Sequence, residues 1–514
     1  MKLRTLPLLL ALHAAPLLAA APVVPDPMQA MQMALRYYQM AASAGDAEAQ
    51  TKMGWLFEQG LGVAKDLGQA AKWYELAAKQ NEPIGLYNLG LLLLRGDGVT
   101  KDADQAARLM AGAAELNLAA AQSQLATMYE KGIGVPVDLE AAFAWTRRAA
   151  ELGDVPAQNN LGIKLAYGLG TRTNYPEAVT WFTKAAEAGN AEAQGNLGLI
   201  YKEGLGDIKQ DLLAAANWLA LAGSQGHVQS QNRLGWMFEK GQGLPKNMAE
   251  AGRWFRMAAE AGDAPSATHL GWLLETGALG QANSVANSVA DSVANSVANS
   301  VANSVANLAA ALPWYERAAA AGDAAAQNNL GRLYREGQGV AADFARAREW
   351  LLKASAKNEP LAWYNLALMA EQGQGQERNE AEALSLYGKA AEKGVVLAQS
   401  RLGWLLQKNG KTEGAVRWLT KAAEAGDITA QNNLGVLQEQ AKNMAEAARW
   451  YRKAAEAGDK VAQHNLGVLY RDGLGMDKNE AEALAWFQKS AEQGYAKAQL
   501  NLGQLYEKLA TPKK

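Results

Sequence analysis

The sequence predicts an all-α fold, an α/α superhelical solenoid of about 12 helical hairpins. A helix-ending phrase of the type AAEAGD recurs along the chain, mostly at intervals of 32 to 37 residues. Within one interval, two stretches with apolar residues at helical spacing are separated by a Gly-rich turn. Ten of the fifteen tryptophans fall at one position of the second stretch. This combination is typical of stacked hairpins in which a helix A is followed by a helix B.

The repeats are expected to form one continuous solenoid over residues 22–509, followed by a short tail at 510–514. The solenoid opens with a lone B-like helix in residues 28–45 and closes with a lone A-like helix in residues 496–509. We therefore expect 13 A helices and 13 B helices. Complete hairpins are expected to begin near residues 47, 82, 118, 155, 191, 228, 264, 324, 359, 396, 428 and 460. The helix-ending glycine, or the residue equivalent to it, is placed at 45, 80, 116, 153, 189, 226, 262, 322, 357, 394, 426, 458 and 494.

Tryptophans occupy two positions of the repeat. A large ring at a fixed position of every helix B is expected to fill the gap between neighbouring hairpins. The ten residues at this position are Trp73, Trp145, Trp181, Trp218, Trp254, Trp314, Trp350, Trp418, Trp450 and Trp486. Four others follow a glycine of helix A directly, where a ring either packs in the core or faces the groove; these are Trp55, Trp236, Trp272 and Trp404.

Glycines and caps mark the helix boundaries. A glycine within helix A, such as Gly54 or Gly162, costs about 1 kcal/mol and therefore indicates a close approach between helices. Pairs such as Gly60 and Gly62 are expected to end helix A, where a positive φ is needed. Capping boxes are expected at the start of several B helices, formed by Asn247 with Glu250, Asn379 with Glu382, Asn443 with Glu446 and Asn479 with Glu482.

Residues 283–306 form a low-complexity insertion built from NSVA quartets. Its 24 residues equal the excess of this 60-residue repeat over 36, so it is expected to enter the turn between helices A and B and leave the hairpin intact. A period of four drifts by about 40° per step around an α-helix, so the valines form no single apolar stripe. We expect a projecting, mobile segment with at most transient helix, which either tunes the surface or is a neutral expansion.

The first 21 residues have the pattern of a secretory signal peptide. Lys2 and Arg4 precede an apolar core from Leu6 to Leu18 that is too short to span a bilayer, and small alanines follow it. No other apolar run is long enough to span a membrane, and the chain has neither cysteines nor N-x-S/T sequons. These features predict an exported protein, periplasmic or secreted, of a Gram-negative bacterium.

Composition argues against several function classes. The 52 acidic and 50 basic residues balance, so nucleic acid is not an expected partner. Beyond the predicted signal, three histidines lie in different repeats at different positions, and no phosphate-binding, metalloprotease or serine-hydrolase motif is present. We therefore predict a non-enzymatic protein with no catalytic residue, cofactor or metal site.

The phrases AEAQGNLG, an EGLG-type turn, A-x-x-W and the AAEAGD ending resemble the Sel1-like repeat family, a relative of tetratricopeptide repeats, from Met28 to Leu509. The resemblance implies an adaptor or scaffold, and exported bacterial members similar in layout regulate envelope sensors, cell-wall enzymes or polysaccharide export. A cysteine-rich branch is associated with β-lactam binding. The absence of cysteine separates this chain from that branch.

One polar residue precedes each Leu-Gly-type step of helix A, and together these residues form what we call the polar ladder. Its members are Lys52, Asn88, Gln124, Asn160, Asn196, Arg233, His269, Asn329, Asn365, Arg401, Asn433, Asn465 and Asn501. By resemblance to tetratricopeptide proteins, helices A line the concave face and these amides pair with the backbone of an extended ligand. The alternative is that the amides bond to neighbouring helices within the stack.

We expect the Asn residues of the ladder, together with Arg233 and Arg401, to bind an envelope or periplasmic protein segment. Arg233 and Arg401 would contact carboxylates, and aromatic anchors would come from Trp236, Trp404, Tyr87 and Tyr364. Two alternatives stay open, namely a peptidoglycan or other glycan ligand that contacts Trp and Asn, and a β-lactam-binding or hydrolytic enzyme.

Overall fold

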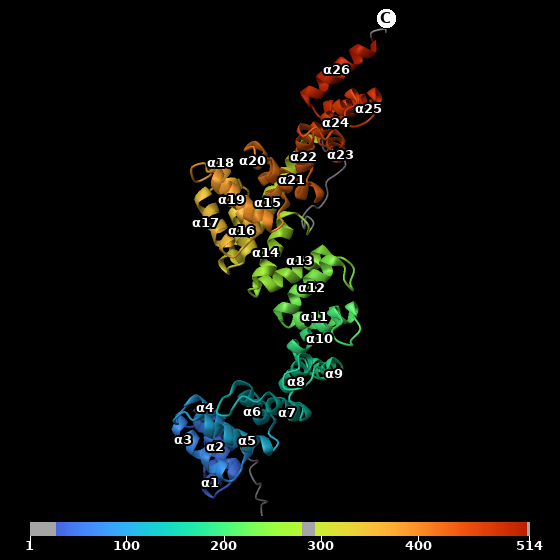
Figure 1. Cartoon of the computed structure of the whole chain (residues 1–514). Helices are drawn as coiled ribbons and strands as arrows, with labels where there is room; N and C mark the ends of the chain where they lie inside the picture. Colours follow the sequence, from blue (N-terminus) through green and yellow to red (C-terminus); the bar gives the residue numbers. More distant parts are fainter. Residues whose placement is uncertain (1–26, 280–292, 511–514) are drawn as a thin grey trace, which may run out of the picture. The chain divides into compact units, whose positions relative to one another are not determined.

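A computed structural model describes residues 27–279 and 293–510, in which every regular element is an α-helix (Figure 1). The chain forms two compact units, Met1–Ser230 and Gln231–Lys514. The described part contains 26 helices, and the predicted all-α repeat fold is confirmed. Within this part, no helix is both long enough and apolar enough to cross a bilayer.

Helices of the N-terminal unit alternate between type B and type A from its first described helix. They are α1 (Pro27–Ser43), α2 (Ala47–Gln59), α3 (Leu67–Lys79), α4 (Pro83–Arg95), α5 (Ala103–Glu115), α6 (Ala119–Lys131), α7 (Leu139–Glu151), α8 (Val155–Tyr167), α9 (Tyr175–Glu187), α10 (Ala191–Glu203) and α11 (Leu212–Ser224). The even-numbered helices are of type A and the odd-numbered ones of type B. Helix α12 (Val228–Lys240) contains the boundary between the units.

Helices of the C-terminal unit continue this alternation. They are α13 (Met248–Glu260), α14 (Ala264–Glu275), α15 (Val293–Ala320), α16 (Ala324–Glu336), α17 (Phe344–Ala356), α18 (Pro360–Gln372), α19 (Glu380–Glu392), α20 (Val396–Lys408), α21 (Thr412–Glu424), α22 (Ile428–Gln440), α23 (Met444–Glu456), α24 (Lys460–Asp472), α25 (Glu480–Glu492) and α26 (Ala496–Ala510).

In most hairpins the core forms where a glycine of helix A meets a side chain of helix B, whereas α6 and α18 carry Ala126 and Ala367 at this position. A Cβ added to Gly54 would lie 2.6 Å from the ring of Tyr74, and one added to Gly162 would lie 2.7 Å from the ring of Phe182. Tyr74 is fully buried and Phe182 is 2% exposed. The predicted close approach at these two glycines is therefore confirmed, because a methyl group there would overlap the ring in its present position.

The tryptophans of helix B lie beside this contact rather than at its centre. Four of the ten are buried, namely Trp181, Trp254, Trp418 and Trp450, and the other six are partly buried. The residue after each tryptophan lies deeper, as Phe182 does after Trp181. A lysine one turn later covers several of the rings, with Lys184 Nζ 3.8 Å from the Trp181 ring centre. The tryptophan position is thus the margin of the core.

Left-handed residues end the helices as predicted at the turn pairs, where Gly60 and Gly62 have φ of 74° and 73°. At the end of helix B, however, three of the assigned equivalents were wrong by one residue. The left-handed residues there are Asn81, Asn117 and Asn358, with φ of 59°, 61° and 63°, and not residues 80, 116 and 357. Asparagine substitutes for glycine at these positions because it tolerates the left-handed region better than other residues with a side chain.

Three of the four expected asparagine caps are present. Asn247, Asn379 and Asn479 each accept a hydrogen bond from the backbone N–H three residues later, at 3.0–3.1 Å. The prediction for Asn443 was wrong, because it makes no such bond and its Nδ2 donates to Gln438 Oε1 at 3.0 Å instead. Asn443 has φ −88° and ψ 64° and lies in a three-residue turn that begins after Gln440. The shorter turn sets a different backbone geometry at the cap.

The NSVA insertion is partly within the described chain. Residues 283–292 lie outside the described residues, whereas α15 begins at Val293 and continues through Pro313 to Ala320. Residues 293–306, for which transient helix was considered, are thus part of α15 in the structure. Adding residues to an existing helix fixes one residue per hydrogen bond, so indifferent helix formers extend helix B more readily than they nucleate a helix alone.

Candidate functional site

The polar ladder is part of a hydrogen-bond network between consecutive A helices. Asn196 Nδ2 donates to Asn159 Oδ1 at 3.1 Å, and Asn365 Nδ2 donates to Asn328 Oδ1 at 2.8 Å. Asn501 Nδ2 likewise donates to His464 Nε2 at 2.8 Å. In each case the acceptor precedes the ladder position of the previous A helix. These ladder amides therefore stabilise the stack.

Other ladder residues bond to a buried tyrosine of helix B. Tyr315 Oη donates to Glu275 Oε2 at 2.7 Å, and Asn329 bonds to the same hydroxyl. Burial raises the pKa of Tyr315 well above its ordinary value, and the neighbouring Glu275 carboxylate raises it further. The same arrangement joins Asn88 to Tyr74 and Asn465 to Tyr451.

Arg401 already contacts a carboxylate of its own chain. Its Nε and Nη2 donate to the two oxygens of Glu371 at 2.9 and 2.6 Å, and Tyr387 Oη donates to the same carboxylate at 2.8 Å. Burial raises the pKa of Glu371, but the hydrogen bonds from Arg401 and Tyr387 outweigh it and lower that pKa overall. Arg401 thus completes an internal ion pair. Among the other ladder residues, Asn160 is exposed, and Arg233 and Asn433 are partly buried.

A pocket of about 510 Å³ lies on the A-helix face of the C-terminal unit, and we call it the Trp272 pocket. His269 stacks between two tryptophans, with ring centres 4.1 Å from Trp236 and 5.4 Å from Trp272. His269 Nε2 lies 2.6 Å from Glu239 Oε2, which fixes the imidazole. Trp272 is 45% exposed at the rim. The pocket is lined by Trp236, Glu239, Lys240, Pro265, Thr268, His269, Trp272, Asp323, Ala325 and Asn329.

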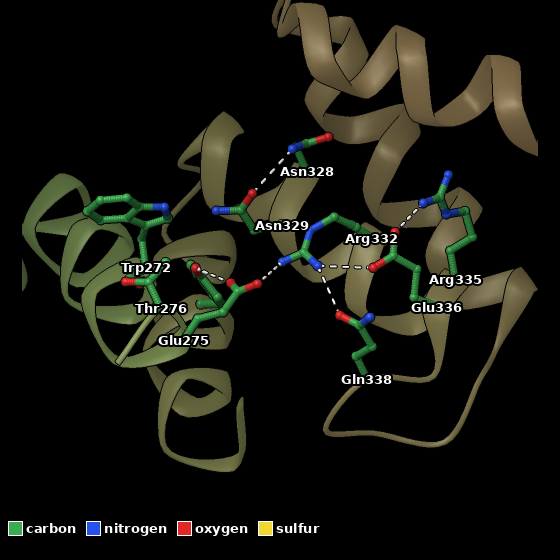
Figure 2. A network of polar contacts seen from close by, with 10 residues as sticks. Trp272, Glu275, Thr276, Asn328, Asn329, Arg332, Arg335, Glu336 and Gln338 are labelled. Atoms are coloured by element: carbon green, nitrogen blue, oxygen red, sulfur yellow. Dashed lines mark hydrogen bonds and ion pairs between the residues drawn. The ribbon is translucent and has the colours of Figure 1, made fainter. Parts of the chain in front are cut away.

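The floor of the Trp272 pocket joins α14 to α16. Thr268 Oγ1 donates to Oδ1 of Asp323, the N-cap of α16, at 2.9 Å. Below it, Arg332 of α16 bonds to Glu275 of α14, and Figure 2 shows the two side chains pointing toward each other. Because this ion pair joins the same two helices, it holds the walls of the pocket at a fixed spacing.

A second pocket, of about 410 Å³, occupies the equivalent place in the N-terminal unit, and we call it the Trp55 pocket. Its floor is again a hydroxyl bonded to a helix cap, with Thr51 Oγ1 donating to Glu82 Oε2 at 2.6 Å. Trp55 is 43% exposed at its rim. All seven lining residues, Glu48, Thr51, Lys52, Trp55, Glu82, Ile84 and Asn88, occupy the same repeat positions as seven that line the Trp272 pocket. Each unit therefore carries one Trp–Asn pocket on its own A helices.

A smaller pocket lies where this position holds threonine instead of tryptophan. Between α6 and α8 the tryptophan position holds Thr127, and the pocket there has a volume of about 120 Å³. Nearby, Lys164 Nζ forms an ion pair with Glu130 at 3.2 Å. Ladder residue Asn160 lines this smaller pocket, so the amide is retained where the aromatic wall is lost.

The direction of Trp55 and Trp272 could not be predicted from their positions in the repeat, and neither was among the expected anchors. Trp236 and Trp404, which were expected anchors, are only partly exposed, as are Tyr87 and Tyr364. A spacing in the sequence distinguishes the pocket tryptophans: threonine stands four residues before Trp55 and before Trp272, whereas asparagine and serine precede Trp236 and Trp404. The threonine forms the floor and the tryptophan the wall.

The repeats of this chain are similar to a known family and to solved structures. A family model described as Sel1 repeat matches residues 25–46, 47–82, 83–118, 119–154, 155–190, 191–227, 228–263, 305–323, 324–359, 360–395, 396–427, 428–459, 460–495 and 496–513. A protective antigen with an SLR fold, present in uropathogenic Escherichia coli strains, is 29% identical, with a TM-score of 0.55 over 93% of this chain and 91% of that one. A Sel1 repeat protein from Oxalobacter formigenes is 30% identical over 45% of this chain and 94% of that one, with a TM-score of 0.39. A search of curated proteins found no match.

Proposed function

Because the chain belongs to the Sel1 repeat family, whose solenoids are protein-interaction scaffolds, we propose that it is an exported scaffold that binds an extended segment of an envelope protein on its A-helix face. In each unit, the proposed binding surface consists of that unit's part of the polar ladder together with its own pocket, the Trp55 pocket or the Trp272 pocket. The proposed role is non-enzymatic: the protein holds a partner and leaves its covalent structure unchanged.

The repetition of one pocket on the A-helix face carries this proposal. Exposed tryptophans are the side chains that most often dominate protein interfaces, because a rigid ring buries a large area at little entropic cost. Trp55 and Trp272 are each about half exposed beside a ladder amide. Each pocket lies between consecutive A helices of one unit, so it suits a ligand that presents side chains to successive repeats, as an extended segment does.

Export rests on the pattern of residues 1–21, which lie outside the described residues. The similar protein from uropathogenic Escherichia coli is described as a protective antigen, which supports a location that antibodies reach. Fractionation of cells that produce the full-length chain tests this part: we expect a processed protein in the periplasm or medium. A full-length protein in the cytoplasm would contradict export.

Binding is tested by affinity capture from an envelope extract with three forms of the chain. The parent is compared with Trp55→Ala/Trp272→Ala and with Tyr167→Ala, which removes an aromatic ring that is 68% exposed and lines neither pocket. We expect a protein that the parent and Tyr167→Ala retain and the double variant loses. Equal retention by all three forms would contradict the pockets as the binding surface.

The polar ladder is tested separately with Asn329→Ala/Asn433→Ala/Asn465→Ala. Because Asn329 and Asn465 also bond within the stack, circular dichroism must show that this variant is folded before its binding is compared. Titration with peptidoglycan fragments, followed by tryptophan emission, tests the glycan alternative. Binding of fragments without any protein partner would replace the protein-segment proposal.

A further inference from the structure

Helix α1 has the contacts of a B helix on one side only. Toward α2 it packs as other B helices pack on the following A helix, and Ala42 joins a cluster with Met53 and Leu56. Its other side carries Ala34, Tyr38 and Ala41. Ala34 and Ala41 are partly buried, and the Tyr38 side chain is 38% exposed. This second side corresponds to the one that other B helices bury against their own helix A.

The same three residue types are fully buried in other B helices. Ala70, Tyr74 and Ala77 of α3 are each 0% exposed, as are the equivalent residues Ala311, Tyr315, Ala318, Ala383, Tyr387, Ala390, Ala447, Tyr451 and Ala454. In those hairpins the tyrosine ring lies over the middle of helix A. Tyr38 is thus a core residue whose covering helix is missing from the described chain.

Helix α26 presents the complementary surface, because it is an A helix with no B helix of its own in the described chain. Ten glycines at the Leu-Gly-type step of other A helices would each place an added Cβ within 2.9 Å of a side chain of helix B. At Gly503, the eleventh, an added Cβ meets no atom within 4 Å. Tyr506, one turn later, is 50% exposed. The groove that receives a ring elsewhere is open here.

The polar chemistry of the two ends matches as well. The ring position is the residue of helix B that lies over the glycine position of helix A. In every described hairpin with a tyrosine at the ring position, the tyrosine hydroxyl donates a hydrogen bond to a glutamate four residues after the glycine position. The pairs are Tyr74–Glu58, Tyr315–Glu275, Tyr387–Glu371 and Tyr451–Glu439, at 2.7–2.8 Å. On α26 this position holds Glu507, and on α1 the ring position holds Tyr38. Phenylalanine at the ring position goes with different residues there: Phe182 faces a helix with Ala166, and Phe255 faces one with Glu239, which pairs with His269.

We propose that α26 of one copy and α1 of a second copy of this chain dock as helices A and B of one complete repeat. Tyr38 of the second copy lies over Gly503, and its hydroxyl donates to Glu507. Helix α2 of that copy then follows α26 as the next A helix and covers Leu500, which is 63% exposed. Such a contact is heterologous, so it joins copies head to tail. The occupant of each open end is therefore a second copy of this chain.

Sedimentation velocity of the purified chain, after natural processing of its N-terminus, tests the proposal over a wide concentration range. We expect species larger than the monomer to grow with concentration. Gly503→Gln fills the open groove without a clash in the monomer, and Tyr38→Ala removes the ring. Each is expected to weaken association by at least about tenfold. Gly388→Gln, a matched control in α19 with equally open space, is expected to associate as the parent does.

Mixing the two variants gives the sharpest result. Gly503→Gln retains an intact α1 end and Tyr38→Ala an intact α26 end, so an equimolar mixture is expected to form one-to-one dimers that grow no further. A parent that is monomeric at all concentrations would overturn the proposal. So would oligomers that survive both substitutions, or folded variants that stay monomeric when mixed.

Discussion

Tyr451 on α23 lies across Gly435 on α22, with its ring 2.6 Å from where a Cβ of residue 435 would be. The hydroxyl of Tyr451 donates a hydrogen bond to Glu439, which lies one turn further along α22. One residue pair therefore sets the distance between the two helices, and a second fixes their relative rotation.

Substituting Gly435→Ala is expected to destabilise the hairpin by about 1–3 kcal/mol, because the methyl group overpacks the ring. This loss opposes the gain of about 1 kcal/mol that alanine brings to a helix interior. Gly388→Ala in α19 has open space and is expected to show only the gain. Hydrogen exchange of the α22 and α23 amides reads the local effect, because repeats open in parts. Equal stabilisation by both substitutions would refute the close-packing argument.

The two kinds of A–B turn predict different costs for the same cap substitution. Asn247→Ala removes a cap bond to Glu250 N–H and is expected to cost about 1 kcal/mol. Asn443→Ala removes no cap bond and is expected to cost far less. Urea denaturation of the two variants measures the difference. Equal losses would show that Asn443 caps α23 after all.

The Arg401–Glu371 pair predicts a pH-dependent contribution to stability. Glu371 has a lowered pKa when folded, so its contribution is present above the unfolded value of about 4.3 and is lost as pH falls through the folded value. Arg401→Met is expected to cost about 1–2 kcal/mol at neutral pH, less than for a fully buried pair, because the Arg401 side chain is 39% exposed.

Urea midpoints measured at several pH values check this expectation. The difference in urea midpoint between the parent and Arg401→Met is expected to disappear toward acidic pH. The double variant Arg401→Met/Glu371→Met serves as the control, since replacing both partners leaves no unpaired buried charge. A gap that stays constant down to low pH would assign the effect to packing.

Deleting residues 283–306 is expected to restore an ordinary 36-residue repeat. Asn307 then stands six residues after Gly277, the spacing that separates Asp66, the N-cap of α3, from Gly60. Asn307 already lies near Gly277, its Nδ2 being 3.0 Å from the position of a Cβ there. We expect less helix by circular dichroism and an unfolding free energy within about 1 kcal/mol of the parent, as for surface insertions. A collapse of stability would mean that the insertion supports the hairpin.

Periodicity predicted the fold because it reports features repeated in most hairpins, such as the glycine beneath Tyr74 and the left-handed residue that follows a helix end. The repeat pattern indicated Trp181 as the core residue, because tryptophan recurs at that position, but the following Phe182 is buried more deeply. The ladder was visible as a row of amides, but whether Asn365 faces Asn328 or a ligand depends on distances between helices. The pockets could not be predicted from the sequence, because residues such as Thr268 and Asn329 lie 61 positions apart in the chain and come together only in the folded structure.

The glycine, the ring above it and the glutamate that holds the tyrosine hydroxyl all lie within single hairpins, such as the pair α22 and α23. Contacts between successive hairpins combine apolar packing, as of Ala42 on Met53 and Leu56, with amide and hydroxyl bonds at recurring positions. A gene duplication that copies one whole hairpin therefore carries its matched core with it and meets compatible neighbours on both sides. Recombination that cuts between α22 and α23 separates the matched residues, so repeats of this chain are expected to be gained and lost in whole hairpins.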